Sequence, residues 1–235
     1  MEILTQSYSL KSRDVNMFRR LRTSQLFELL QEAATEHSEL LGVGIHEIRK
    51  KDLMWVLARQ NVHIRRMPSY GEQIRIETWP GKTVHSLYPR YYRLLDPNGV
   101  PLVESSSIWI LADIHERTLV PSSRSGIEFS FEKRGIELPL PSPPRTFYTD
   151  CSFSFTVPYS YIDMNGHMNN TRYFDLAENL SPAAAEGRDP VGILVEYAAE
   201  LRLGGTYELL YGQSENRFFL KTGGEKALFR IIMDY

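Results

Sequence analysis

Two stretches of the chain carry apolar residues at helical spacing, and each is followed by stretches with strand character. Apolar positions three and four residues apart mark one face of an α-helix. In the first half they are Leu26, Leu29, Leu30, Ala33, His37 and Leu40, and in the second half Tyr173, Leu176, Ala177 and Leu180. The pattern predicts one main helix in each half. Because short polar side chains accept hydrogen bonds from free amide groups, the expected N-caps are Thr23 or Ser24 and Asn169 or Asn170.

Strand signals follow each helix. The first half contains MWVLARQNVHI, QIRIETW, YYRLL and SSSIWIL, and the second contains GILVEYAAELRL, YELLYGQ, RFFLKT and ALFRIIM. The segment DPNGV at Asp96 to Val100 is typical of a hairpin turn, since Asn-Gly adopts positive φ readily. Each half is therefore expected to be one helix and a curled antiparallel sheet, which is an α+β fold.

A proline-rich segment separates the halves. Five of the thirteen prolines fall between residues 121 and 147, where they oppose both helix and central strand. The sequence predicts an N-terminal domain at residues 1–120, a linker at 121–146 and a C-terminal domain at 147–235.

The two halves resemble each other. The helix segments LFEL at Leu26 and YFDL at Tyr173 align with a shift of 147 residues, and both halves have an Asp-x-Asn triplet before the helix. Aligning the triplets Asp14-Val15-Asn16 and Asp163-Met164-Asn165 places Phe18 opposite His167. The pattern indicates a repeated unit to which the second half has added a histidine.

Composition narrows the function classes. A net charge of −2 gives no basic field for nucleic acid or an anionic membrane, and no apolar run approaches the ~18 residues of a membrane span. The single cysteine, Cys151, excludes an internal disulfide and suits a reducing cytosol. The N-terminal residues lack a signal-peptide pattern. We therefore expect a cytoplasmic protein that binds neither nucleic acid nor membrane.

Polar residues gather in YIDMNGHMNNTRYFDLAENL, which begins at Tyr161. Asn165-Gly166 is a good hairpin dipeptide, so a simple polar turn is one interpretation. The other is an active site, because the residues after Gly166 are expected to start a helix whose free N–H groups can stabilise an oxyanion. Asp163 can activate water, His167 can transfer protons near neutral pH, and Asn165 can hold a water or substrate without titrating.

The segment DMNGHMNNTRY resembles the Asp-x-x-Gly-His-x-Asn-Asn-x-x-Tyr signature of hotdog-fold thioesterases. Two such units in one chain, with the histidine only in the second, resemble the acyl-ACP thioesterases of plants and bacteria. The resemblance implies tandem hotdog domains, each with a sheet wrapped around a central helix, and catalytic roles for Asp163, Asn165 and His167. It also implies a catalytic glutamate, Glu200, in VEYAAEL.

One departure from the family pattern bears on mechanism. Leu201 stands where the family often has cysteine, which disfavours a Cys-His-Asn nucleophile. Water attack is the expected route, with either Glu200 or the Asp163/His167 pair as general base.

The resemblance further implies a reaction and a partner. The expected reaction is hydrolysis of fatty acyl-[acyl carrier protein], with the chain carried on 4′-phosphopantetheine and released as free fatty acid. The N-terminal domain would be non-catalytic and would hold the acyl chain, with Leu53 to Gln60 as a pocket wall. The acidic carrier would dock on early basic clusters, such as Arg19, Arg20 and Arg22. No cofactor or metal is expected, and a homodimer is possible.

Two alternative functions fit the same residues. One is an acyl-CoA thioesterase, and the other is a non-catalytic acyl-binding module.

Overall fold

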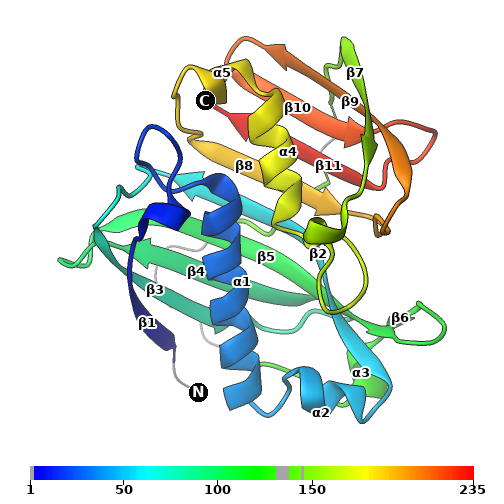
Figure 1. Cartoon of the computed structure of the whole chain (residues 1–235). Helices are drawn as coiled ribbons and strands as arrows, with labels where there is room; N and C mark the ends of the chain where they lie inside the picture. The colour runs from blue at the N-terminus through cyan, green and yellow to red at the C-terminus, as the bar shows by residue number, and fades with distance from the viewer. Residues whose placement is uncertain (1–2, 131–137, 144–145) are drawn as a thin grey trace.

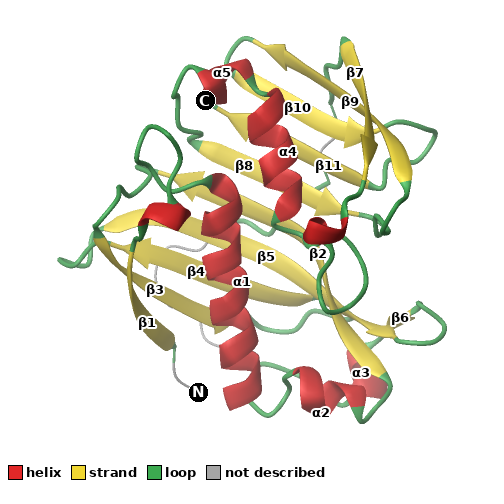
Figure 2. Cartoon of the chain, in the orientation of Figure 1, coloured by secondary structure: helices red, strands yellow, loops and turns green. Residues whose placement is uncertain are grey.

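Antiparallel strands from both halves of the chain join into one sheet in the computed structural model, which describes residues 3–130, 138–143 and 146–235 (Figure 1; Figure 2). The first half supplies β1 (Leu4–Ser9), β2 (Leu53–Ile64), β3 (Gln73–Pro80), β4 (Tyr88–Leu95), β5 (Pro101–Asp113) and β6 (Leu119–Val120). The second half supplies β7 (Cys151–Thr156), β8 (Gly192–Tyr197), β9 (Thr206–Ser214), β10 (Arg217–Thr222) and β11 (Phe229–Asp234).

The described strands follow the order β1-β3-β4-β5-β2-β8-β11-β10-β9-β7, with β6 beside β5. The halves meet where β2 pairs with β8, from Arg59 opposite Glu196 to His63 opposite Gly192. Two arginines, Arg59 and Arg230, bind the carboxylate of Glu196 at this junction, with N–O distances of 3.0 and 2.5 Å. The predicted pair of sheets is therefore one continuous sheet.

The main helices lie side by side on one face of that sheet (Figure 1). These are α1 (Thr23–Leu40) and α4 (Arg172–Leu180), and shorter helices are α2 (Ile45–Arg49), α3 (Ser122–Ser125) and α5 (Pro182–Ala185). Phe27 of α1 stacks on Phe174 of α4 with ring centroids 3.7 Å apart. One hydrophobic core thus runs through both halves. Since each half combines one main helix with antiparallel strands, the α+β prediction is confirmed.

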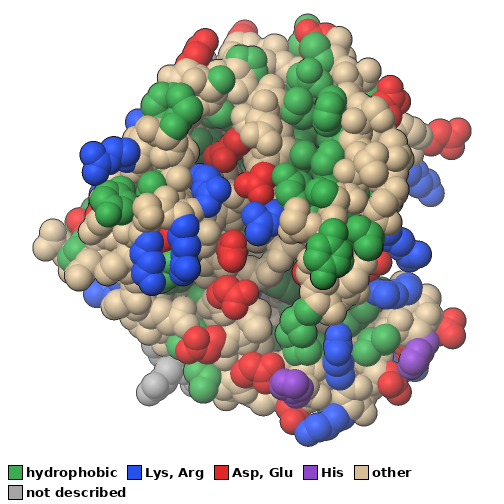
Figure 3. Space-filling model, in the orientation of Figure 1, with side chains coloured by type: hydrophobic (Ala, Val, Ile, Leu, Met, Phe, Trp, Pro, Cys, Tyr) green, Lys and Arg blue, Asp and Glu red, His purple; other side chains and the backbone are tan. Residues whose placement is uncertain are grey.

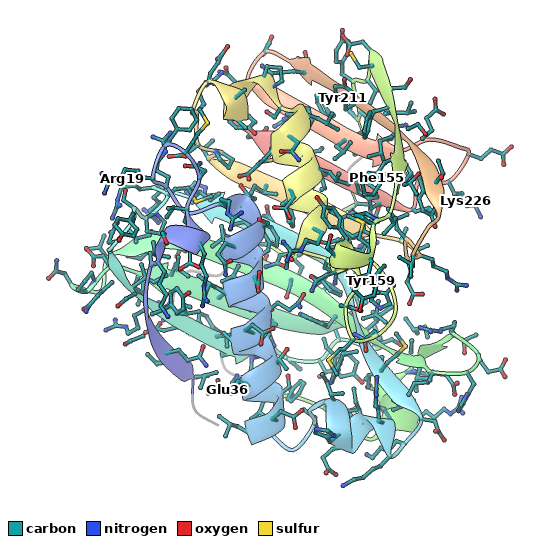
Figure 4. All side chains as sticks on the ribbon, viewed as in Figure 1. Arg19, Glu36, Phe155, Tyr159, Tyr211 and Lys226 are labelled. Carbon is teal, nitrogen blue, oxygen red and sulfur yellow. The ribbon has the colours of Figure 1, made fainter. Side chains whose placement is uncertain are left out.

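The second helix is half as long as the first and covers less of the sheet. Figure 3 shows charged side chains of both signs along α1, and a strip of hydrophobic side chains between α4 and β7. Phe153 of β7 is 45% exposed for this reason. Tyr211 and Phe155, labelled in Figure 4, come from the two strands that form this strip.

The halves repeat the same local structure with a shift of 147 residues. Strand β1 begins at Leu4 and β7 at Cys151, and the 3₁₀ turns that follow begin at Ser12 and Tyr159. This is the shift that the helix motifs predict.

The proline-rich segment packs against the first half where the structure describes it. Thr83 and Phe129 exchange hydrogen bonds, and the Ser106 hydroxyl donates to the carbonyl of Pro139 at 2.9 Å. Within the predicted linker, residues 131–137 and 144–145 lie outside the described residues.

Three local predictions are wrong. Leu40 is 69% exposed, because it lies in the last turn of α1, past the core. The N-cap positions are Arg22 and Thr171, and neither makes a side-chain cap. The predicted strand GILVEYAAELRL ends at Tyr197, so Glu200 lies in the irregular segment before β9.

No described helix has the length and apolar character needed to cross a membrane.

Candidate active site

The loop from Ile162 to Met168 is a closed turn. Its ends form a β-bridge, and the N–H of Asp163 donates to the carbonyl of His167 at 3.0 Å. Asp163 Oδ1 accepts the N–H of Asn165 at 2.8 Å, and Gly166 has a φ of +82° that favours glycine. The chain then returns as a bridge before α4 starts at Arg172, so the expectation of a helix directly after Gly166 is wrong.

The equivalent loop in the first half corrects the predicted repeat alignment. Asn16 accepts the N–H of Phe18 at 3.0 Å and donates its own N–H to Arg20 at 2.8 Å, as Asp163 does with Asn165 and His167. Arg20 is therefore the counterpart of His167. Aligning the Asp-x-Asn triplets therefore misplaces the first half by two residues. The matching backbone bridges of the two turns give the correct alignment.

The imidazole of His167 lies between two carboxylates. Its Nδ1 is 3.7 Å from Asp163 Oδ2, and its Nε2 is 3.8 Å from Glu200 Oε1. Both distances exceed a hydrogen bond but are short enough to close around a substrate. The side chains of Asp163 and His167 are each 17% exposed and that of Glu200 is 29% exposed, so all three can be reached from the cavity.

Backbone pairing holds Glu200 beside the turn. The N–H of Met168 donates to the carbonyl of Leu201 at 2.8 Å, and His167 bridges to Arg202. Leu201 stands where the resembled family often has cysteine. Its hydrocarbon side chain is fully buried and offers no nucleophile.

Two arginines of the first half reach across to the turn and to Glu200. Arg117, in the hairpin between β5 and β6, donates to Glu200 Oε1 at 3.0 Å. Arg49 of α2 donates to Asn165 Oδ1 at 3.3 Å. The structure thus brings all four predicted residues together and adds these two. An isolated arginine in a turn carries no motif, so sequence reasoning missed Arg117.

The remaining signature residues hold the scaffold. Asn169 Oδ1 accepts the N–H of Thr171 at 2.9 Å, and the carbonyl of Asn170 accepts the Tyr197 hydroxyl at 2.9 Å. Tyr173 packs edge-on against Tyr197 with ring centroids 5.4 Å apart, and burial raises the pKa of the Tyr173 hydroxyl. These contacts fix the strand end before Glu200 against the start of α4.

A cavity of about 960 Å³ opens at this turn. The turn residues and Glu200 lie at its rim, while most of its wall comes from the first half. The wall includes residues of α1, α2, β2, β4 and β5, such as Gln31, Ile48, Leu53, Trp55, Leu57, Tyr88, Arg90 and Trp109. Leu53 to Leu57 line the cavity, but their neighbours up to Gln60 do not.

The first basic cluster lies away from this opening. Arg20 pairs with Asp189 at 2.8 Å, Arg22 binds the carbonyl of Arg13, and the Arg19 guanidinium lies 5.4 Å from the Tyr70 ring. Figure 4 labels Arg19 on one side of α1 and Tyr159, just before the turn that holds His167, on the other. A different cluster, Arg49 to Lys51, begins at the cavity wall.

The part of the chain that the structure describes contains no group of three or more His, Cys, Asp or Glu side chains that could hold a metal ion.

Family models match both halves of the chain. The acyl-ACP thioesterase N-terminal domain matches residues 2–123, and the acyl-ACP thioesterase C-terminal domain matches residues 148–227.

The named relatives have low sequence identity to this chain, but the alignments cover most of it. The chain is 25% identical to a chloroplastic palmitoyl-acyl carrier protein thioesterase of Cuphea hookeriana over 95% of its own length. It is 24% identical to a chloroplastic dodecanoyl-[acyl-carrier-protein] hydrolase of Cinnamomum camphora over 88% of its length. It spans about 60% of the length of these relatives.

Solved structures share the whole fold. An acyl-ACP thioesterase from Bacteroides thetaiotaomicron superposes with a TM-score of 0.87 at 24% identity, covering 99% of this chain and 97% of that one. A 12:0-ACP thioesterase from Umbellularia californica gives a TM-score of 0.80 at 21% identity, covering 99% and 96%. The predicted tandem hotdog fold is thereby confirmed.

Proposed function

Because this chain belongs to the acyl-ACP thioesterase family, we propose that it hydrolyses fatty acyl thioesters of acyl carrier protein and releases the free fatty acid. The observation that carries this proposal is His167 held between Asp163 and Glu200 at the rim of a cavity large enough for an acyl chain. The names of the Cuphea and Cinnamomum relatives support the choice of acyl carrier protein.

We assign the two carboxylates different roles. Asp163 already accepts a backbone N–H within the turn, so it orients the imidazole through Nδ1. Glu200 faces Nε2 and is more exposed, so it is the base that takes a proton from the attacking water. Asn165, held by Arg49, positions the thioester or the water.

The reaction balances with these groups alone. The water oxygen attacks the thioester carbonyl carbon while Glu200 takes a proton from it. The carbon–sulfur bond then breaks, and protonated His167 gives its proton to the departing thiolate. The proton held by Glu200 passes to His167, which restores the site for the next turnover.

We also propose a division of labour along the chain. Residues 1–120 hold the acyl chain without a catalytic role, residues 147–235 supply Asp163, Asn165, His167 and Glu200, and residues 121–146 link them. The origin of the cavity wall in the first half supports this division.

The carrier protein is proposed to dock near the cavity opening. Basic residues Arg49, Lys50 and Lys51 offer charge complementary to an acidic partner there. A homodimer and a cytoplasmic location stay predictions. The exposed free thiol of Cys151 supports a reducing compartment.

The test is thiol release from an acyl-ACP by the wild type, His167→Ala and the matched control His63→Ala. Removing the imidazole is expected to lower kcat about 10²- to 10⁴-fold, the usual contribution of general acid–base catalysis. His63 is exposed on β2 and outside the cavity wall, so its removal should leave kcat unchanged. Full activity in His167→Ala would contradict the assignment.

A further inference from the structure

A buried arginine forms part of the cavity wall. Arg90 of β4 is 5% exposed, and its guanidinium contacts only uncharged groups. Nη1 lies 3.2 Å from His37 Nδ1 and 3.3 Å from Thr78 Oγ1, and Nη2 lies 3.1 Å from Ser38 Oγ. No carboxylate among the described residues pairs with it.

In the hydrogen bond between Arg90 and His37, only one assignment of donor and acceptor is possible. A guanidinium has donors only, so His37 Nδ1 must accept, and the imidazole is neutral with its proton on Nε2. Burial lowers the pKa of Arg90, but an arginine remains charged in proteins. The wall therefore presents a positive charge that no anion of the described residues balances, and such a charge is costly to strip of water.

The strand register places Arg90 far across the sheet from β8, which leads to Glu200. Arg90 lies opposite Pro80 of β3 and Ser107 of β5, and β4 is three strands from β8 in the sheet. Its partners His37 and Ser38 belong to the last turns of α1, so the side chain crosses the space between that helix and the sheet. Tyr92, the next residue on the same face of β4, belongs to the closed core. Arg90 thus lies in the cavity wall three strands away from β8, the strand that leads to Glu200.

We propose that Arg90 limits the length of the acyl chain, a proposal that rests on the thioesterase function proposed above. Neighbouring strands are about 4.8 Å apart, so β8 and β4 are separated by about 14 Å. An extended alkyl chain advances ~1.3 Å per carbon–carbon bond, so it spans this distance in roughly eleven bonds. A longer aliphatic tail would press its methyl end against the guanidinium and surround that charge with hydrocarbon, which is costly. We therefore expect a preference for chains of about 8 to 12 carbons.

The test compares acyl-ACPs of 8 to 18 carbons with the wild type and Arg90→Met. Methionine keeps an unbranched side chain but removes the charge, so the ratio of kcat/KM for 16 carbons to that for 10 carbons should rise at least tenfold. Arg93→Met is the matched control, because Arg93 lies on the same strand but faces the other side, 2.9 Å from Glu77. This control should keep the wild-type length profile.

Binding of free fatty acids of graded length measures the same limit without catalysis. A wild type that hydrolyses no thioester but binds only the shorter acids would refute the proposed function and leave this inference standing. An Arg90→Met protein that is folded by thermal melting, yet has the wild-type length profile in both assays, would overturn the inference.

A fatty acid with a terminal hydroxyl group tests whether the charge of Arg90 or only its size limits the chain length. A 14-carbon acid with an ω-hydroxyl group should bind the wild type at least fivefold tighter than the plain acid, and this gain should vanish in Arg90→Met. Equal binding of the two acids to the wild type would contradict the role of the charge.

Discussion

Glu200 Oε1 has two neighbours that draw it in different directions. Arg117 Nη1 lies 3.0 Å away and His167 Nε2 lies 3.8 Å away, so the carboxylate is hydrogen-bonded to the arginine and not to the histidine. Arg117 also lies 3.2 Å from Met54 Sδ, which ties it to the cavity wall. The first half of the chain therefore orients Glu200, the proposed general base, in the second.

Replacing Arg117 tests this positioning role. Arg117→Met should lower kcat about tenfold, a loss of ~1.4 kcal/mol of transition-state stabilisation, with less than a threefold change in KM. Arg117→Lys should recover part of the loss, because it restores a cation near Glu200. Steady-state kinetics on one acyl-ACP check both variants. An unchanged kcat in Arg117→Met would show that Glu200 needs no help from the arginine.

The proximity of the candidate site residues could be predicted from the sequence, but their surroundings could not. Asp163, Asn165 and His167 are adjacent in the chain, and their side chains are brought together by one short turn. Arg117 reaches the site only because a hairpin of the first half folds over the second. The contact between Arg90 and His37 could not be predicted either. A histidine on a helix stripe and an arginine directly before YYRLL carry no sequence signal that they lie together.

At the scale of elements, the start of α1 depends on a side chain from α4. Glu178 Oε1 accepts both the N–H and the hydroxyl of Thr23, at 3.0 and 2.5 Å. A carboxylate at a helix N-terminus satisfies free N–H groups and favours the helix dipole. This contact replaces the local N-cap that the sequence suggested, and it joins the two halves.

Glu178→Ala should therefore lower the free energy of unfolding by about 1–2 kcal/mol, since the helix loses its cap. Thermal melting should show a fall of several degrees in Tm. Glu186→Ala, which removes an exposed carboxylate from the same half, is the control and should leave Tm unchanged. An equal fall in both variants would contradict the capping role.

The pH dependence of this contact has a definite sign. Burial raises the pKa of Glu178 above its ordinary value of 4.5, and the Thr23 hydrogen bonds offset this only in part. The folded state thus binds the proton more tightly than the unfolded state, so this contribution is complete below pH 4.5 and is lost as pH rises through the folded pKa. The stability of the wild type relative to Glu178→Gln should therefore grow as the pH falls from 7 to 4.

The sequence predicted the elements better than their ends and alignment. Helical and strand periodicity located the main helices and most strands, because burial of one face imposes a period on the residues. The end of β8 at Tyr197 depends on the carbonyl of Leu228, which accepts from Ala198 and Ala199, a contact with no local signal. The repeat alignment was wrong by two residues because the short Asp-x-Asn motif matches by chance. The backbone bridges of the two turns give the correct shift of 147 residues.

At the scale of the whole molecule, the candidate site forms because an edge strand of each half-sheet pairs with the other. The pairing of β2 with β8 lets a cavity built mostly from the first half open at the His167 turn of the second. Such pairing between residues more than a hundred positions apart cannot be read from periodicity. It explains why most of the cavity wall and the candidate site residues come from different halves.

The same arrangement shifts the expected docking surface. The cluster from Arg19 to Arg22 contacts Asp189, Tyr70 and Arg13, whereas Arg49 lines the cavity next to Asn165. A carrier that delivers its chain to this opening approaches Arg49 to Lys51 first. Free coenzyme A has no protein surface to meet that cluster, so the two substrates should differ in kcat/KM.

The most direct measurement is a competition between dodecanoyl-ACP and dodecanoyl-CoA, mixed in equal amounts and followed by mass spectrometry. The ratio of their rates of consumption gives the ratio of kcat/KM for one active site under one set of conditions. The account predicts that dodecanoyl-ACP is consumed at least tenfold faster. Faster consumption of dodecanoyl-CoA would make the protein an acyl-CoA thioesterase, and consumption of neither substrate would contradict the proposed hydrolase function.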